Sequence, residues 1–154
     1  MFVENHFQNA YVTRNLDKTV SLLKERHGLA DFIHFEPDMD AITPRGRGRA
    51  VVRAAMAWTG LFQIEIIEPV SGLVDHYLDY LPPDDASMRF HHIAMRTFDW
   101  EGTLAEIRRQ RRIMAFESAV DGCKFVYVDA RESVGHYLEY VWTTPEMWKA
   151  IGGS

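Results

Sequence analysis

An internal repeat constrains the fold of this chain more than any other feature of its sequence. Residues 8–19 (QNAYVTRNLDKT) align without a gap on residues 92–103 (HIAMRTFDWEGT). The alignment matches Ala10 with Ala94, Thr13 with Thr97, Asn15 with Asp99 and Thr19 with Thr103. Each half also shows the same order of predicted elements, which is a strand, a helix and three strands. We therefore expect two βαβββ modules related by internal pseudo-symmetry.

The spacing of apolar and turn residues predicts the elements of the first half. Asn15 is suited to cap a helix, and Gly28 is suited to end it. The expected elements are strands over 6–14, 31–36, 50–58 and 61–68, a helix over 15–28 and a polar loop over 38–49. A short amphipathic segment over 73–81 then leads to a Pro-Pro-Asp-Asp turn.

The same elements are predicted again after that turn. The expected elements are strands over 89–98, 113–119, 123–130 and 135–142, and helices over 100–112 and 145–151. We divide residues 1–154 into module 1 (5–70), a linker (71–88), module 2 (89–143) and a C-terminal helix (144–151) of a single domain. The predicted fold class is mixed α/β (α+β), with curved sheets around a central cleft.

Composition narrows the possible partners and the cellular compartment. The net charge of −5 and the scattered basic residues argue against a nucleic-acid-binding face. The chain has neither a long apolar run nor a secretory leader, so we expect no membrane partner. A single cysteine, Cys123, excludes an intrachain disulfide and fits a reducing, cytoplasmic location.

Two glutamates occupy equivalent positions in otherwise apolar strands. Glu65 lies in FQIEIIE and Glu139 in HYLEYVW, the fourth strands of the two modules. Gln8 and His92 form a second equivalent pair in the first strands. A pseudo-two-fold axis would bring all four side chains to one point. Taken singly, each glutamate could instead be exposed on a half-solvated strand, and His92 could be an ordinary hydrogen-bonded histidine.

Strand alternation separates the neighbouring histidines of RFHHIAMRTFDW (89–100). Successive side chains of a strand point to opposite faces. His92 is therefore expected to face the cleft together with Phe90 and Arg96. His91 is expected on the opposite face with Ile93 and Met95, packed under the following helix.

The segments FHHIAMRTFDW, IEIIEPVSG and YVDARESVGHYLEYV resemble the vicinal oxygen chelate superfamily, to which glyoxalase I, methylmalonyl-CoA epimerase, extradiol dioxygenases and bleomycin-resistance proteins belong. The resemblance covers roughly residues 5–142 and is strongest to the epimerase and glyoxalase branch. It implies one divalent metal ion (Mg, Mn, Co, Ni, Fe(II) or Zn) held by Gln8, Glu65, His92 and Glu139. This ligand set resembles that of some glyoxalase I enzymes. A first-strand histidine is commoner in the superfamily, so His6 is the alternative to Gln8.

The resemblance also implies a reaction. A metal that chelates a carbonyl makes the neighbouring C–H more acidic, and a ligand carboxylate can move the proton. Glu139 and Glu65 are the candidate bases of such a lyase or isomerase, with a small carbonyl compound or thioester as substrate. Arg96, Tyr137, Trp58 and Phe90 are candidate substrate contacts, and a homodimer is the expected assembly.

Two alternatives depend on departures from the family pattern. Epimerases carry an additional acidic base before the third strand of the first module, where this chain has TPRGRGRAVVRAAM. An Fe(II) extradiol-type dioxygenase would need two histidines and one carboxylate, and therefore His6 as a ligand. A metal-free, resistance-type binding protein would hold a planar ligand between aromatic side chains. The arginines of RGRGR (45–49) could contact an anionic group or lie in a solvated loop.

Overall fold

The computed structural model describes residues 3–154 as nine strands and five helices. The first module and its linker contain β1 (His6–Thr13), α1 (Leu16–His27), β2 (Ile33–Phe35), β3 (Asp38–Thr43), β4 (Gly46–Thr59), β5 (Phe62–Gly72) and α2 (Asp75–Leu78). The second half contains β6 (Met88–Arg96), α3 (Trp100–Arg109), β7 (Met114–Val120), β8 (Cys123–Asp129), α4 (Arg131–Val134), β9 (Tyr137–Thr143) and α5 (Pro145–Ala150). None of the helices in this described part is long and apolar enough to span a bilayer.

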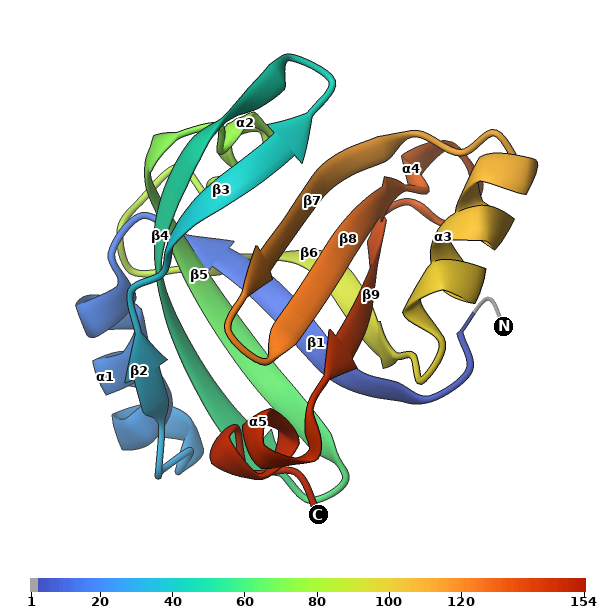
Figure 1. The fold of residues 1–154 in the computed structure, drawn as a ribbon. Coiled ribbons are helices and arrows are strands. Elements are labelled where there is room, and N and C mark those ends of the chain that lie inside the picture. The colour runs from blue at the N-terminus through green and yellow to red at the C-terminus, as the bar shows by residue number, and fades with distance from the viewer. Residues whose placement is uncertain (1–2) are drawn as a thin grey trace.

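Eight of the strands form a closed, barrel-like curved sheet in the order β4-β3-β7-β8-β9-β6-β1-β5, and β5 returns to β4 (Figure 1). The two modules meet where β1 runs antiparallel to β6. On either side of this seam the pairing is parallel, β1 with β5 and β6 with β9. The short β2 extends the sheet beside β4.

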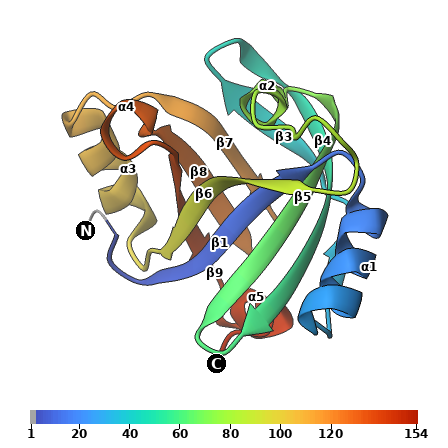
Figure 2. The same ribbon diagram turned by 180° about the vertical axis from the view of Figure 1, so that it is seen from behind.

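The helices lie outside the sheet or across its ends (Figures 1 and 2). Leu16, Val20 and Leu23 of α1 pack on Ala55 and Ile66. In the other module, α3 packs in the same way on β8 and β9. The short helices α2 and α5 lie across the ends of the barrel, with α2 at the end near the β3–β4 turn and α5 at the opposite end.

The repeat predicted from the sequence is present in atomic detail. The hydroxyl groups of Thr13 and Thr19 lie 2.7 Å apart, and so do those of Thr97 and Thr103. The side chains of Asn15 and Asp99 cap their helices by accepting bonds from the main-chain nitrogens of Lys18 and Gly102. These matched contacts support the alignment on which the pairing of Glu65 with Glu139 was based.

The expected polar loop over 38–49 is wrong. The structure places residues 38–43 in β3 and residues 46–59 in β4, joined by a tight turn. Met39 and Ala41 point inward and alternate with the exposed Asp38 and Asp40, which is a strand pattern hidden by the many charges. β2, which corresponds to the strand predicted over 31–36, and β3 pair with successive parts of β4. The two strands therefore lie one after the other along the same edge of β4.

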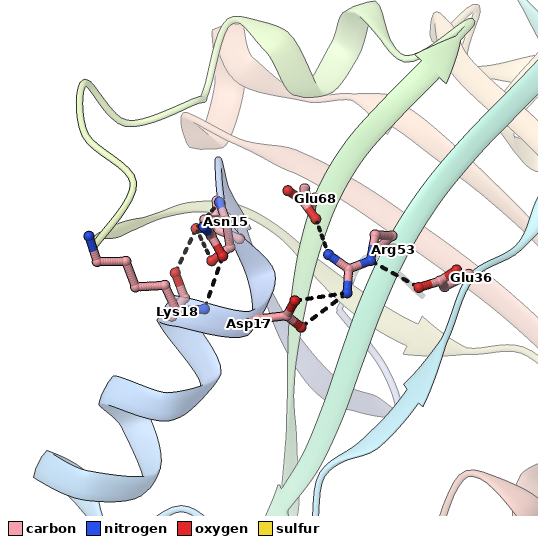
Figure 3. A network of polar contacts seen from close by, with 8 residues as sticks. Asn15, Asp17, Lys18, Glu36, Arg53 and Glu68 are labelled. Carbon is pink, nitrogen blue, oxygen red and sulfur yellow. Dashed lines mark hydrogen bonds and ion pairs between the residues drawn. The ribbon is translucent and has the colours of Figure 1, made fainter.

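A partly exposed ion-pair network joins α1, β4 and β5 on the outside of module 1 (Figure 3). The guanidinium of Arg53 contacts Asp17 at 3.0 Å, Glu36 at 2.9 Å and Glu68 at 2.9 Å. These hydrogen bonds raise the pKa of Arg53 above its ordinary value. Arg53 thereby ties three segments that are far apart in the sequence.

Candidate metal centre

Three of the four predicted ligands meet inside the barrel. Glu65 comes from β5, His92 from β6 and Glu139 from β9. Nε2 of His92 lies 3.1 Å from a carboxylate oxygen of Glu139 and 3.8 Å from one of Glu65. One donor atom from each residue lies within 4.8 Å of the others, which is close enough for all three to bind a single ion. Within residues 3–154 this is the one such group of histidine, cysteine or acidic residues.

Strand pairing explains why these side chains converge. Ala10 lies between two of them in the sheet, since it pairs with Glu65 on one side and with His92 on the other. Ala94 in turn pairs with Glu139. Both alanines are fully buried, and their small side chains leave room above the sheet for the longer ligand residues.

Burial controls the electrostatics of this cluster. His92 is 0% exposed, Glu65 7% and Glu139 6%. Desolvation raises the pKa of Glu139 to about 8 and lowers the pKa of His92 to about 3. Burial and then the charge of Glu139 raise the pKa of Glu65. Two buried carboxyl groups beside a neutral imidazole favour either protons or a cation between them.

Gln8 lies on the inner face of β1, next to Ala94 in the sheet. Its side-chain nitrogen donates to Oε1 of Gln63 at 2.7 Å. Nε2 of Gln63 donates to the main-chain oxygen of Ile151 at 2.9 Å, so α5 helps to hold both amides. This anchoring occupies the nitrogen of Gln8 and leaves its oxygen as the atom suited to a metal.

His6 is not brought to the cluster. Its Nε2 lies 2.9 Å from Oδ1 of Asn9 and 3.1 Å from the main-chain oxygen of Gln8. Its ring is tilted against Phe62, with the ring centroids 5.0 Å apart. The placement of His6 therefore gives no support to a two-histidine ligand set.

The expected position of His91 is wrong, because a β-bulge interrupts strand alternation in β6. Ala10 pairs with His92 and Tyr11 with Phe90, so His91 is an extra residue opposite no partner. Its ring points into the barrel, where Nδ1 lies 2.9 Å from Nδ1 of His92 and the ring stacks on Tyr137. His91 is therefore not on the face of Ile93 and Met95.

The bulge also changes the side on which Phe90 lies. Its ring contacts Tyr11 and His136, with centroid distances of 5.6 Å and 5.1 Å. Tyr11 pairs with Ile66, which packs under α1 on the outside of the sheet. The structure thus places Phe90 outside the barrel, away from the other predicted substrate contacts.

Trp58 and Arg96 lie at the end of the barrel covered by α5. The indole nitrogen of Trp58 donates to the main-chain oxygen of Ile151 at 2.7 Å. The guanidinium of Arg96 lies between Trp148 and Phe98, 3.9 Å and 4.9 Å from the ring centroids. Trp58 thus packs beside the anchored amides, whereas Arg96 is turned toward the aromatic residues around α5.

Tyr137 lies between the cluster and the opposite end of the barrel. It pairs with His92 in the sheet, and its ring also lines a hollow of about 240 Å³. The hollow opens between the β3–β4 turn, α2 and α4, and its lining includes His76, Arg45 and Arg131. The two arginines are paired with carboxylates, Arg45 with Asp75 and Arg131 with Asp129.

Several residues of the site were missed by sequence reasoning. Tyr127 lies against His92, with ring centroids 4.6 Å apart, and its hydroxyl is 2.7 Å from that of Tyr77 on α2. Nε2 of His76 is buried without a hydrogen-bond partner in the described structure. Gln63 could have been found from strand alternation, because it lies two residues before Glu65. The α2 side chains carried no signal, since their position depends on how the linker crosses the barrel.

Comparisons with known proteins concern the fold and the family of the chain. A model of the family described as Glyoxalase/Bleomycin resistance protein/Dioxygenase superfamily matches residues 7–127. No curated protein matches the chain.

Solved structures with the same fold include methylmalonyl-CoA epimerases. The enzyme from Mycobacterium tuberculosis has a TM-score of 0.61 at 12% identity, covering 94% of this chain and 91% of that one. The enzyme from Streptomyces coelicolor, in complex with 2-nitronate-propionyl-CoA, has a TM-score of 0.58 at 16% identity, covering 92% and 98%. A hypothetical protein from Bacillus halodurans C-125 has a TM-score of 0.58 at 15% identity, covering 90% and 94%. The mixed α+β fold predicted from the sequence and the glyoxalase-like architecture implied by the resemblance are confirmed.

Proposed function

We propose that this chain, which belongs to the glyoxalase/bleomycin resistance protein/dioxygenase superfamily, is a metal-dependent lyase or isomerase that moves a proton next to a carbonyl group. The observation that carries the proposal is the buried cluster of Glu65, His92 and Glu139. Two carboxylates are enclosed there, and within residues 3–154 the basic side chain paired with them is a neutral imidazole. Such a cluster would destabilise the fold unless protons or a metal ion occupied it.

The donor atoms fit a divalent metal of the first transition row or magnesium. Carboxylate oxygens and one imidazole nitrogen suit these ions, and the amide oxygen of Gln8 would complete a set of four protein ligands. Gln8, Glu65, His92 and Glu139 would then hold the ion between them. The ion, when bound, supplies a Lewis acid that polarises the carbonyl and makes the neighbouring C–H more acidic.

Glu139 is the residue proposed to move the proton. A carboxylate oxygen of Glu139 takes the proton from carbon, so that a C–H bond breaks and an O–H bond forms. The electron pair shifts onto the carbonyl oxygen. Glu139 then returns its proton to the substrate, or a Glu65 that starts protonated donates its own proton while Glu139 keeps the one it took. In the metal-free protein, burial raises the pKa of both carboxyl groups above that of an exposed glutamate. The reaction needs no oxidant or reductant.

The hollow beside α2 is the proposed approach for the substrate. Tyr137 and His76 line it and also contact His91, which lies next to His92. The solved epimerases with this fold include one in complex with methylmalonyl-CoA and NH4+, and these precedents support a thioester or small carbonyl compound as the substrate class.

The inner faces of β3 and β4 carry no acidic side chain that could act as a base in addition to Glu65 and Glu139. Met39, Ala41, Ala50, Val52 and Ala54 form this wall of the described interior. Since the additional base expected of an epimerase is missing, we propose chemistry in which the ligand carboxylates themselves move the proton. This favours a glyoxalase-type or isomerase reaction over faithful methylmalonyl-CoA epimerisation.

The test begins with purified protein reconstituted with each candidate ion and analysed for metal content. Solvent-deuterium exchange is then followed in acyl-CoA thioesters and in hemithioacetals. We expect one ion per chain and exchange in one of these classes. Glu139→Gln should lower the exchange rate by about 10²-fold or more. Glu25→Gln, on the exposed surface of α1, is the matched control and should leave the rate unchanged.

Two results would contradict the proposal. Absence of a bound ion after reconstitution would remove its basis. If Glu65→Ala and His92→Ala bound an aromatic ligand as well as the unaltered protein does, a metal-free binding protein would be the better interpretation.

A further inference from the structure

The bulge in β6 brings two buried imidazole rings into direct contact. Nδ1 of His91 lies 2.9 Å from Nδ1 of His92, and Nε2 of His91 lies 2.8 Å from the main-chain oxygen of His76. Both rings are 0% exposed. A charge on a ring with no contact to solvent is costly to bury, so each imidazole is neutral and carries one N–H.

The main-chain oxygen of His76 determines where these two protons reside. A carbonyl oxygen can only accept, so Nε2 of His91 must donate to it. Nδ1 of His91 then carries a lone pair and accepts from Nδ1 of His92. His92 therefore holds its proton on Nδ1, which leaves the lone pair on Nε2. That nitrogen is the atom directed at Glu139 and Glu65.

We infer that His91 is a positioning residue, which fixes the tautomer and ring orientation of His92 so that Nε2 is available to a metal ion. The inference rests on the proposed function, since it concerns the same cluster. It goes beyond that function by assigning a task to a residue outside the predicted set of metal ligands. Partners of this kind typically change metal affinity by about 10- to 100-fold.

The other module shows that the bulge does not itself require a histidine. In β1, His6 pairs with Met95 and Gln8 with Ala94, so Phe7 is the extra residue at the position equivalent to His91. Phe7 is buried and has no hydrogen-bonding side-chain atom. The phenyl ring of Phe7 therefore fills one bulge. The bulge next to His92 holds instead the imidazole of His91, which can both donate and accept a hydrogen bond.

The two supporting contacts also differ in kind. Gln8 is anchored through the amide of Gln63, which can be reoriented by rotation. His92 is anchored through the ring of His91, whose Nε2 bonds to a fixed main-chain carbonyl and whose Nδ1 contacts Nδ1 of His92. The arrangement thus specifies which nitrogen of His92 carries the proton, in addition to where the ring lies.

The inference is tested first in metal-free protein labelled with ¹⁵N, where histidine chemical shifts and long-range couplings identify each tautomer. We expect His92 to be the Nδ1–H form in the unaltered protein. In His91→Phe the proton should move wholly or partly to Nε2, where it can be donated to Glu139. His91→Asn retains an acceptor near the position of Nδ1 and should restore the Nδ1–H form.

Metal affinity, measured by competition with a chelator for Zn²⁺ or Ni²⁺, provides the second readout. His91→Phe should bind about 10- to 100-fold more weakly, and His91→Asn should recover to within a few-fold of the unaltered protein. An Nε2–H tautomer of His92 in the unaltered protein would overturn the inference even if no variant folded. So would equal affinity of His91→Phe and the unaltered protein. If the unaltered protein bound no metal, the proposed function would fail, while the tautomer measurement would still decide whether His91 orients His92.

Discussion

At the scale of single residues, Gln8 and His92 show how one position of a repeat can serve different chemistry. They occupy equivalent places, seven residues before the caps Asn15 and Asp99. His92 offers a ring nitrogen toward the two glutamates, whereas Gln8 can offer only its amide oxygen to a metal. Because Gln63 holds the side-chain nitrogen of Gln8, the side-chain oxygen of Gln8 is fixed in one position, where it is available to a metal ion.

Removing Gln8 should therefore weaken metal binding. We expect Gln8→Leu to lower the affinity for a divalent ion at least about tenfold, since a ligand is lost and Gln63 is left without its partner. His6→Asn is the matched control on the same strand, and it should bind as the unaltered protein does. Chelator competition on both variants measures the effect. The opposite ranking would restore His6 as the ligand and with it the dioxygenase hypothesis.

The positions of Glu65 and Glu139 could be predicted from the sequence, because the repeat fixes their equivalence and the apolar strands around them indicate burial. The side on which His91 and Phe90 lie could not. A bulge inserts one residue without any required residue type, as His91 and Phe7 show in equivalent places. Every side chain before the bulge then changes face, so alternation predicts correctly only on one side of it.

At the scale of elements, Arg53 holds together parts that the barrel alone leaves on its outer surface. Its three carboxylate partners come from the start of α1, the connection after β2 and the strand β5 (Figure 3). An arginine shared by several carboxylates stabilises the fold more than isolated exposed pairs do. The conformational entropy of its side chain is lost only once for all three contacts.

Arg53→Met should lower the free energy of unfolding by about 1 to 2 kcal/mol, the range expected when several partly exposed pairs are lost together. The control is Arg49→Met, whose partners Asp38 and Asp40 lie on the adjacent strand of the same hairpin. Because Arg49 is exposed to solvent, its loss should lower the free energy of unfolding less than the loss of Arg53 does. Urea unfolding at low salt and at about 1 M NaCl measures both, and salt should narrow the difference. Equal losses in the two variants would show that the network does not couple the elements.

The elements themselves were predicted to different extents. Both long helices have the caps and apolar spacing that the sequence indicates. The sequence predicts a loop where the β3–β4 hairpin lies. The exposed face of the hairpin is so rich in aspartate and arginine that these charges obscure the alternation of the buried Met39 and Ala41. The four-residue α4 buries none of its side chains and has no side-chain cap, so the sequence carries little signal for it. The inward side chains of α2 contact distant strands, and local sequence does not contain those contacts.

At the scale of the whole molecule, the buried site makes stability depend on pH in both directions. In metal-free protein, the pKa of Glu139 is raised from 4.5 to about 8, so the folded chain retains a proton that the unfolded chain loses. Stability should fall as pH rises from about 4.5 toward 8. The pKa of His92 is lowered from 6.5 to about 3, and that of His76 to about 2. The unfolded chain then binds protons that the folded chain does not, and stability should fall as pH drops below about 6.5.

The expected maximum therefore lies between about pH 4.5 and 6.5, and each such proton changes the free energy of unfolding by up to about 1.4 kcal/mol per pH unit. Urea unfolding in the presence of a chelator at pH 5.5, 7 and 8.5 measures the alkaline side. Glu139→Gln, which cannot ionise, should flatten it, and His76→Phe should flatten the acidic side. Rising stability of the metal-free protein from pH 5.5 to 8.5 would contradict the buried, protonated state of the cluster.

The position of α5 across one end of the barrel has a practical consequence for attaching the protein to a surface. Ile151 accepts bonds from both Trp58 and Gln63, and the C-terminus leaves the molecule at this end, away from the hollow beside α2 (Figure 1). Attachment to a bead or sensor surface through a linker after Ser154 would thus point the hollow toward bulk solution. A tether that pulls on the last turn itself would act on the amides that hold Gln8, so the linker has to be long enough to carry no load.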